Sequence, residues 1–358
     1  MNYLNKKRRN FIIYMVVVIV LIFAVFNTVL TFKIHNQLEK MAQNPGRWPA
    51  GAYVYDPGIG FDFSPNISGY ISDSSYYVKS HKFGYRIAEN DDPDTYQSGG
   101  VLSLGCSVTY GDEVESDQTF TQLIADSLGL PAYNYGVSSF SYIHALVKAQ
   151  KLNDNGILDT LRPSIVVLGC WRGLTNRSRT PFPPIASKNI PLTAAFITKN
   201  DDGIMIKYPI STQQVFELAT LYRKDGPNLS IKKFIKIFAA VPKFVYVFVK
   251  NKMTYGNARG IISNNKVSDY ELYDFYFTGI ENIFSNKTKI IVLHMPTKLN
   301  DRPNDELLKA IADHTNIIFV DGESAIKKYN VSTSEYQGKH PQPEAHMAYA
   351  KETLNRLK

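Results

Sequence analysis

The residues with the clearest capacity for chemistry lie in a short glycine-bounded loop, Gly105-Cys106-Ser107-Val108-Thr109-Tyr110-Gly111. The apolar run 101–104 precedes the loop, and apolar residues at helical spacing follow it from Phe120. A serine in this position would stand at the carboxyl end of a buried strand and near the start of a helix, where open α/β sheets bind ligands and negative charge is stabilised. Ser107 is therefore a candidate nucleophile, and the alternative interpretation of the loop is an ordinary tight turn.

A histidine near the carboxyl terminus is the candidate base. Of the seven histidines, His340 has the most suitable context, in Gln337-Gly338-Lys339-His340-Pro341 ahead of a final helical segment. A loop at that point reaches the same edge of a parallel sheet as Ser107, so the two residues can meet although they are distant in sequence. The other histidines, including His346 in the last helix, fit structural roles.

Alternating strands and helices must position these residues. Short apolar runs predict buried strands at 101–104, 131–135, 165–168, 289–293 and 317–320, and helical periodicity fills the intervals. The alternation predicts an α/β fold with a doubly wound, parallel, five-stranded sheet and right-handed crossovers. It lapses between about 173 and 287, an interval too long for a structureless loop, so we expect a folded, largely helical insertion there.

In the same order along the chain, these motifs resemble those of the SGNH/GDSL hydrolase superfamily, especially its membrane-anchored bacterial members. The resemblance covers roughly residues 50 to 172 and 288 to 357. It implies a flavodoxin-like fold with Ser107 as the nucleophile and His340 as the base. Asn134-Tyr135-Gly136-Val137 resembles the family's second block, which implies that the Gly136 amide joins the Ser107 amide in an oxyanion hole.

Three positions depart from the family pattern. Cys106 stands at the aspartate of the first block, Gln337 stands at the aspartate that orients the base, and Gly169-Cys170-Trp171-Arg172 replaces the block that contains an oxyanion asparagine. We expect Gln337 to accept a hydrogen bond from His340 Nδ1, with Glu335 as an alternative acid.

Two polar residues near the third block are candidates to replace the absent asparagine. Arg172 lies one residue after Trp171, and Asn176 follows shortly behind it. Either residue is a candidate oxyanion donor in place of the asparagine. If neither acts as one, acyl transfer would be slowed about 10²–10³-fold, the typical effect of losing such a donor.

Only two cysteines occur, Cys106 and Cys170, too few for a disulfide scaffold. Both follow predicted strands that are neighbours in the family's fold. One interpretation is a disulfide that braces the active-site loops, and the other is a pair of buried free thiols. The cysteines lack metal-ligand spacing, and we expect neither a metal nor a cofactor.

The sequence of the amino-terminal segment predicts a membrane anchor. Residues 11–32 contain no charged side chain and would span roughly 33 Å as a helix, enough for the ~30 Å hydrocarbon core. We expect a basic cytoplasmic tail at 1–10, the anchor at 11–32, a stalk at 33–47 and the catalytic domain at 48–358. Lys6, Lys7, Arg8 and Arg9 place the tail in the cytoplasm and the domain in the periplasm or outside the cell. A cleaved signal peptide is the alternative.

Charge and composition exclude other classes. The four basic residues of the tail supply half of the formal net charge of +8, which leaves no dense basic stripe for nucleic acid. The segment 230–252 is basic and amphipathic, with Lys232, Lys236, Lys243 and Lys250 on one side. It is either an interfacial helix on anionic lipid or an ordinary packed helix with a solvated lysine stripe.

The combined reading is a membrane-anchored serine esterase or acyltransferase. The resemblance implies O-acyl groups of a carbohydrate or cell-envelope polymer as substrate, with acetyl the expected acyl group. One alternative is a catalytically impaired relative that binds polysaccharide or an assembly partner. A second alternative is a lipase or thioesterase in which 230–252 forms a lid. Turnover of p-nitrophenyl acetate distinguishes an active esterase from the catalytically impaired relative. A preference for long acyl chains would distinguish a lipase or thioesterase from an acetylesterase.

Overall fold

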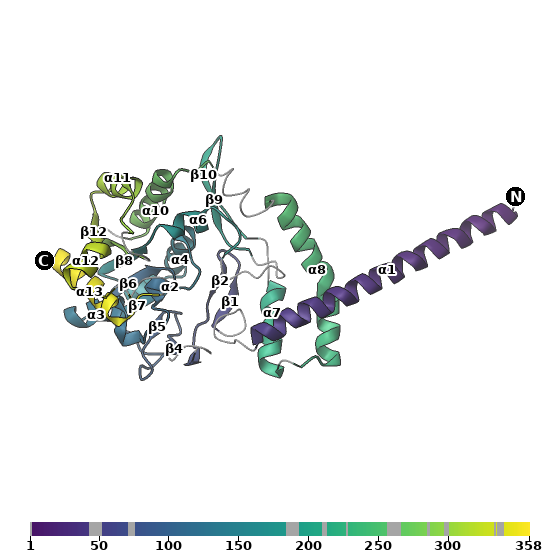
Figure 1. Ribbon diagram of the computed structural model, residues 1–358, viewed down its shortest axis with the longest axis horizontal. Helices are drawn as coiled ribbons and strands as arrows, with labels where there is room; N and C mark the ends of the chain where they lie inside the picture. Colours follow the sequence, from purple (N-terminus) through teal and green to yellow (C-terminus); the bar gives the residue numbers. More distant parts are fainter. Residues whose placement is uncertain are drawn as a thin grey trace.

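The computed structural model describes residues 2–42, 52–70, 76–183, 193–209, 213–226, 228–255, 266–284, 287–296, 301–332, 334 and 340–358. A mixed α/β body occupies most of the chain, and one long helix projects from it (Figure 1). All statements below concern these residues.

A parallel sheet forms the centre of the body. Its strands are β6 (Val101–Gly105), β7 (Ala132–Gly136), β8 (Ile165–Cys170), β11 (Lys289–His294) and β12 (Ile317–Asp321). They lie in the order β12-β11-β8-β6-β7, and each neighbouring pair is parallel. The first strand in sequence thus lies between the second and third, as in flavodoxin-like doubly wound folds. The predicted fold class is confirmed, because continuous apolar runs suit strands covered on both faces.

Three short antiparallel strands extend the sheet beyond the predicted five. β5 (Arg86–Ile87), β4 (Tyr77–Ser80) and β3 (Ser68–Tyr70) continue from β7, so the sheet has eight strands. A separate hairpin pairs β1 (Tyr53–Asp56) with β2 (Gly60–Phe63). These strands are too short to show a clear sequence period, which is why the early segment predicts only strands and turns.

Helices cover both faces of the sheet. α3 (Phe120–Leu128), α12 (Gly322–Lys328) and α13 (Pro343–Leu357) pack together on one face, and α4 (Tyr142–Asp154), α10 (Asp269–Ile283) and α11 (Asp305–Asp313) pack together on the other. Ser141 caps α4 and Ser268 caps α10, each with a capping box. Short helices α2 (Ser107–Tyr110) and α5 (Ile157–Leu161) and the 3₁₀ turn η1 (Ser116–Gln118) complete this part.

The predicted insertion is smaller and more mixed than expected. It contains α6 (Gly173–Ser178), a hairpin of β9 (Phe196–Asn200) and β10 (Gly203–Lys207), α7 (Gln213–Asp225) and α8 (Ile231–Tyr255). The next helix, α10, packs on α4 and α11, so it belongs to the covering layer of the sheet and not to the insertion.

The amino-terminal helix α1 (Asn2–Ala42) is longer than the predicted anchor. Within the described residues it is the one helix long and apolar enough to cross a bilayer. Its carboxyl end packs on α7 and α8 through one face, which includes Asn27, Thr31 and Leu38. The predicted stalk is therefore wrong over residues 33–42, which continue the helix, because apolar and polar contacts with the body hold the last turns in place. Residues 43–47 lie outside the described part.

Candidate active site

Ser107 lies where the sequence motif predicts, beyond the carboxyl end of β6. Cys106 is extended, and Ser107 begins the single turn of α2. The amides of Gly111 and Asp112 donate to the Ser107 carbonyl at 2.9 and 3.0 Å. Ser107 is only 8% exposed, so it lies in a confined position.

Close packing of α2 onto the strand ends requires glycine in two neighbouring strands. A Cβ on Gly136 of β7 would lie 2.3 Å from the Tyr110 amide nitrogen, and one on Gly169 of β8 would lie 2.0 Å from Thr109 Oγ1. Both distances are far shorter than van der Waals contact. The glycines therefore allow α2 to lie directly over the central strands, which fixes the height of Ser107 above the sheet.

Buried polar side chains hold the turn that follows α2. Arg86 of β5 is 2% exposed and donates to the carbonyls of Tyr110 and Gly111 at 2.8 Å and of Val114 at 2.6 Å. Asn134 Nδ2 donates to the Thr109 carbonyl at 3.0 Å. These bonds satisfy the carbonyls at the end of α2, which have no partner within so short a helix.

The structure places His340 against this same turn. Its Nδ1 lies 3.3 Å from Glu113 Oε1, and its Nε2 lies 3.7 Å from Asp112 Oδ2. Because the Asp112 amide bonds to the Ser107 carbonyl, His340 and Ser107 occupy the same edge of the sheet. Within the described residues, however, no hydrogen bond joins Ser107 to His340. Asp112 contacts both residues, through its amide and its carboxylate, and the direct pair is not formed.

Asp112 and Glu113 are the site residues that sequence reasoning missed. Asp112 also accepts hydrogen bonds from the hydroxyls of Ser138 and of Tyr76, the latter at 3.4 Å. Glu113 has a φ of 75°, an uncommon conformation for a residue with a side chain. The available signal was the presence of two adjacent acids directly after the glycine that closes the serine loop. Gln337 and Glu335 lie outside the described residues, so their predicted roles stay predictions.

The predicted oxyanion role of Gly136 is contradicted. Its amide donates to Asn134 Oδ1 at 3.0 Å, so a side chain of the same strand already uses this donor. The following turn has Phe140 N bonded to the Val137 carbonyl at 3.1 Å, and Ser139 has a φ of 72°. In the described part of the chain, the amides of Ser138 and Ser139 have no hydrogen-bond partner. They are better candidate donors at this edge.

Arg172 and Asn176 lie at the start of α6 and within it, and both are exposed. Their predicted role as oxyanion donors stays a prediction. Trp171 lies at the position of the family's asparagine, and its Nε1 donates to Cys106 Sγ at 3.1 Å. The Arg177 guanidinium stacks on the indole at 4.9 Å. The indole therefore supports the loop and its N–H is not available to a substrate.

The possible disulfide is not formed, because Cys106 and Cys170 are both buried free thiols. Cys106 Sγ accepts the indole N–H of Trp171. Burial raises the pKa of the Cys170 thiol well above its usual value, which keeps it protonated. The second interpretation, two buried thiols that pack as small apolar groups, is the one that the structure supports.

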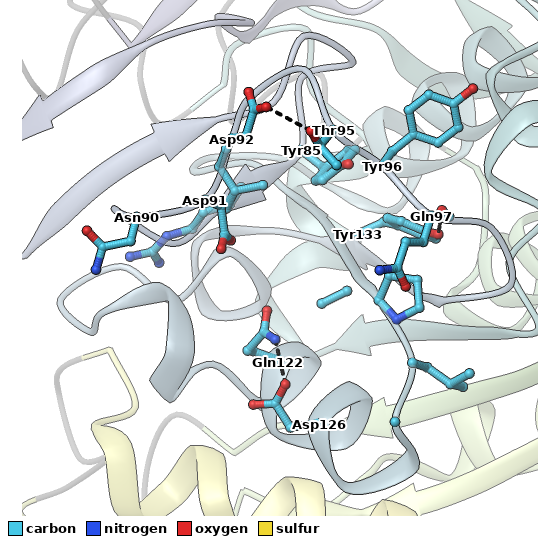
Figure 2. Close-up of a pocket in the computed structure, with 16 residues that line it drawn as sticks. Tyr85, Asn90, Asp91, Asp92, Thr95, Tyr96, Gln97, Gln122, Asp126 and Tyr133 are labelled. Carbon is cyan, nitrogen blue, oxygen red and sulfur yellow. Dashed lines mark hydrogen bonds between the residues drawn. The ribbon is translucent and has the colours of Figure 1, made fainter.

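A separate hollow of about 650 Å³ lies away from Ser107. Pro131 and Ala132, at the start of β7, line it, so it lies at the amino ends of the strands and not at the carboxyl ends that carry Ser107. Figure 2 shows the rings of Tyr85 and Tyr133 beside carboxylate and amide side chains in this hollow. It is a possible binding surface distinct from the candidate active site.

Comparisons with known proteins give structural likenesses only. No family model matches the chain, and no curated protein matches it. A lipolytic protein of the G-D-S-L family from Desulfitobacterium hafniense has 11% identity and a TM-score of 0.31, with 72% of this chain and 99% of that chain covered. A member of the lipolytic G-D-S-L family from Veillonella parvula has 12% identity and a TM-score of 0.32, with 72% and 97% covered.

A third solved structure is a carbohydrate esterase family 2 enzyme with a carbohydrate-binding domain from Corynascus thermopiles. It has 10% identity and a TM-score of 0.35, with 76% of this chain and 68% of that chain covered. At such TM-scores the fold of this chain rests on its own strand order and not on these likenesses. Two G-D-S-L family lipolytic proteins and a carbohydrate esterase are thus among the solved structures that it resembles.

Proposed function

We propose that this protein is a membrane-anchored serine esterase or O-acyltransferase of the SGNH/GDSL type. One observation carries the proposal: a serine at the start of a helix over the central parallel strands shares its sheet edge with a histidine flanked by carboxylates. This combination provides a nucleophile, a base and a group that stabilises the charged base.

The proposed reaction is acyl transfer through Ser107. His340 takes the hydroxyl proton as Ser107 Oγ attacks the ester carbonyl carbon, and the imidazolium then gives that proton to the departing alcohol oxygen. An acyl-serine remains. Water or a sugar hydroxyl attacks it, with its proton passing to His340, and Ser107 regains the proton when the acyl group leaves. For this step His340 Nε2 has to move from Asp112 towards Ser107 Oγ while Nδ1 stays within reach of Glu113.

Glu113 is the proposed replacement for the carboxylate that the family places at the position of Gln337. Its Oε1 lies 3.3 Å from His340 Nδ1, within reach of a charge-assisted hydrogen bond. A carboxylate there orients the imidazole and stabilises its protonated form. This contact makes the loss of the family's aspartate compatible with activity. Glu113 touches the base and not the substrate, so it is a positioning residue.

The proposed oxyanion donors are the amide of Ser107 and the amides of Ser138 and Ser139. The latter two replace Gly136, whose amide is bonded to Asn134. Donors of this kind stabilise the negative oxygen of the tetrahedral intermediate without reorganisation. The Ser138 hydroxyl is bonded to Asp112, which ties the turn that carries these amides to the turn that faces His340.

We propose O-acyl groups of a carbohydrate or cell-envelope polymer as the substrate, with acetyl as the acyl group. The motif resemblance to anchored bacterial members supports this choice. Location outside the cytoplasm follows from the basic residues before the apolar part of α1, which the positive-inside rule keeps inside. In the lipase or thioesterase alternative α8 would have to form the lid, and it packs on α1 and α7 (Figure 1).

The decisive experiment uses the full chain in lipid nanodiscs with a fluorophosphonate probe and p-nitrophenyl acetate. We expect labelling and turnover that disappear in Ser107→Ala and His340→Ala. A Ser127→Ala variant is the matched control, because Ser127 lies on the exposed side of α3. Adding an oligosaccharide acceptor then separates the two activities: an acetylated sugar identifies a transferase, and acetate alone identifies an esterase.

A second candidate function is binding of polysaccharide without catalysis. The absence of a direct bond between Ser107 and His340 in the described residues favours it, and the hollow that the exposed ring of Tyr96 lines is its natural site. Equal rates of ester turnover in the wild-type chain and Ser107→Ala would support this candidate. Loss of oligosaccharide binding in Tyr96→Ala, with ester turnover unaffected by Ser107→Ala, would then locate the ligand, because Tyr96 is exposed in this hollow.

A further inference from the structure

Helix α8 presents an unusual exposed face. Five large apolar side chains on this helix are exposed: Ile231 82%, Ile235 60%, Tyr246 62%, Val249 45% and Met253 83%. On a helical wheel of about 100° per residue they fall within roughly 60° of one another. A helix on the surface of a water-soluble domain normally turns such a stripe towards the core.

Lysines border this apolar stripe. Lys232, Lys236, Lys243 and Lys250 are all exposed, and they occupy the next sector of the wheel, within about 40° of one another. The segment 231–255 contains no aspartate or glutamate. A soluble helix with a solvated lysine stripe usually carries acids as well, so the exposed face is both apolar and uniformly positive.

The opposite face of α8 is packed, so the exposed face is not the result of a loosely placed helix. Ile237, Val241 and Phe244 are buried. Lys233 is also buried, and its ammonium donates to the carbonyls of Asp225 at 3.2 Å and Asn228 at 2.9 Å. These bonds satisfy carbonyls at and just after the carboxyl end of α7. The helix is therefore held in one orientation, and that orientation leaves the apolar stripe outside.

The placement of α8 relates this face to the anchor. Asn27 Nδ2 donates to the Phe238 carbonyl at 3.2 Å, and the rings of Phe32 and Phe234 lie 5.9 Å apart. α8 runs across α1 rather than along it, at the point where the projecting part of α1 meets the body (Figure 1). If α1 stands upright in a bilayer, α8 lies nearly parallel to the membrane surface.

The length of the free part of α1 fixes the depth of α8. The stretch 11–26 is apolar and nearly all exposed, and the buried face begins at Asn27. These residues rise roughly 24 Å, which is shorter than a hydrocarbon core of ~30 Å. The span must therefore include residues up to the level of α8. This places α8 at the boundary between headgroups and acyl chains, the depth at which interfacial helices lie.

We infer that α8 is an interfacial helix that lies on the anionic lipid surface of the leaflet facing the catalytic domain. Its apolar stripe enters the acyl boundary, and its four exposed lysines contact lipid phosphates. The positive charge of the helix complements anionic headgroups. Each lysine near such a surface strengthens the electrostatic attraction, and salt weakens it. The inference rests on the proposed membrane insertion of α1 and adds a second, independent contact with the same bilayer.

The test uses the full chain in vesicles with a nitroxide label on one introduced cysteine, since Cys106 and Cys170 are buried. Three sites are compared: Ile235→Cys on α8, Val20→Cys on α1 and Leu308→Cys on α11. All three residues are exposed, at 60%, 58% and 41%. We expect the label at 235 to be several-fold more accessible to oxygen than to a water-soluble nickel complex, as at 20, and the reverse at 308.

The three sites make the outcomes distinguishable. A label at 235 that behaves as at 308, while the label at 20 is in lipid, overturns the inference and leaves the anchor intact. A label at 20 that is in water overturns the anchor, and the inference with it. Spin coupling between labels at 235, with exclusion of both oxygen and nickel, identifies a second copy as the partner and also overturns the inference.

Charge is tested with two matched sets of substitutions. One set changes Lys232, Lys236, Lys243 and Lys250 to Gln, and the control set changes Lys266, Lys287, Lys309 and Lys351, which are exposed elsewhere. In vesicles with anionic phosphatidylglycerol, we expect the first set to reduce the lipid-exposed population at 235 several-fold and the control set to leave it unchanged. Equal effects of both sets, or none from the first, would count against lysine–phosphate contact.

Discussion

The two ends of this molecule are built on opposite plans. At the sheet edge, buried polar groups hold the serine turn: Arg86 and Asn134 donate to its carbonyls, and glycines let the backbone approach closely. At the end formed by α1, α7 and α8, apolar side chains dominate, and several large ones face outwards. The first plan fixes the position of the turn through directional hydrogen bonds. The second plan leaves an exposed apolar surface, which is expected to contact another apolar surface such as a lipid bilayer.

Under the proposed function, the sheet edge performs the chemistry and the end formed by α1, α7 and α8 provides the location. Hydrogen bonds are directional, so a network of them is the natural means of holding a nucleophile near a base. Apolar burial is non-directional and grows with area, which suits contact with a fluid bilayer. Variants that damage one end should therefore leave the other end largely unaffected, and this separation can be tested.

The largest effect is expected from removing the nucleophile. Ser107→Ala should lower ester turnover at least about 10³-fold, since loss of a serine nucleophile removes the acyl-enzyme route. Steady-state kinetics with p-nitrophenyl acetate measure the change. The lipid exposure of a label at residue 235 should not change in the same variant. A change at both ends would break the proposed separation.

Glu113→Gln should lower kcat by about 10²- to 10⁴-fold while changing KM little, because it replaces the carboxylate beside the base without altering the shape of the site. Asp117→Asn is the matched control, an exposed acid in the same loop. Glu113→Asp should recover part of the loss. A wild-type kcat in Glu113→Gln would transfer the role back to the region of Gln337, which the sequence predicts.

Arg86→Met should lower the free energy of unfolding by about 3 kcal/mol, because it leaves several buried carbonyls without a donor. Urea unfolding in detergent measures the loss, and Arg356→Met, on the exposed side of α13, should change little. Turnover should fall as well, since Arg86 holds the turn that carries Glu113. Unchanged unfolding would mean that the polar network contributes less to the sheet edge than its geometry indicates.

Acid should weaken the sheet half of the molecule through two buried histidines. Burial lowers the pKa of His144 to about 4 and that of His346 to about 3. The unfolded chain takes up protons near pH 6.5 whereas the folded chain resists them, so stability is complete above that pH and falls below it. At pH 5 each histidine should cost about 2 kcal/mol. His346→Asn should flatten the decline measured by unfolding between pH 7.5 and 5.

Much of the fold was accessible from sequence, because fully buried strands leave continuous apolar runs. β8 contains Ile165 to Leu168, and β11 contains Ile290 to Leu293, and both were predicted nearly to the residue. β5 has only two residues, so no period can reveal it. The helical course of residues 33–42 depends on contacts with α7 and α8, and a polar local sequence does not reveal such contacts.

The candidate site was accessible in part for the same reason. The seat of Ser107 follows from a local pattern, a buried strand followed by small residues. The partners of His340 depend on tertiary placement and on the positive φ of Glu113, neither of which a pattern specifies. The Gly136 amide was misassigned because Asn134 folds back onto it, a contact between residues two apart that competes with any substrate.

Under the proposed function, the unbroken course of α1 into its packing on the body determines how Ser107 meets a substrate. A flexible stalk would let the catalytic edge sweep a volume above the bilayer and sample all orientations. A stiff helix that packs on α7 and α8 over its last turns instead holds the body at one distance from the bilayer and in one orientation. Under the proposed function, a polymer substrate must then come to Ser107 at that level, which would restrict the reaction to polymer strands that pass close to the membrane.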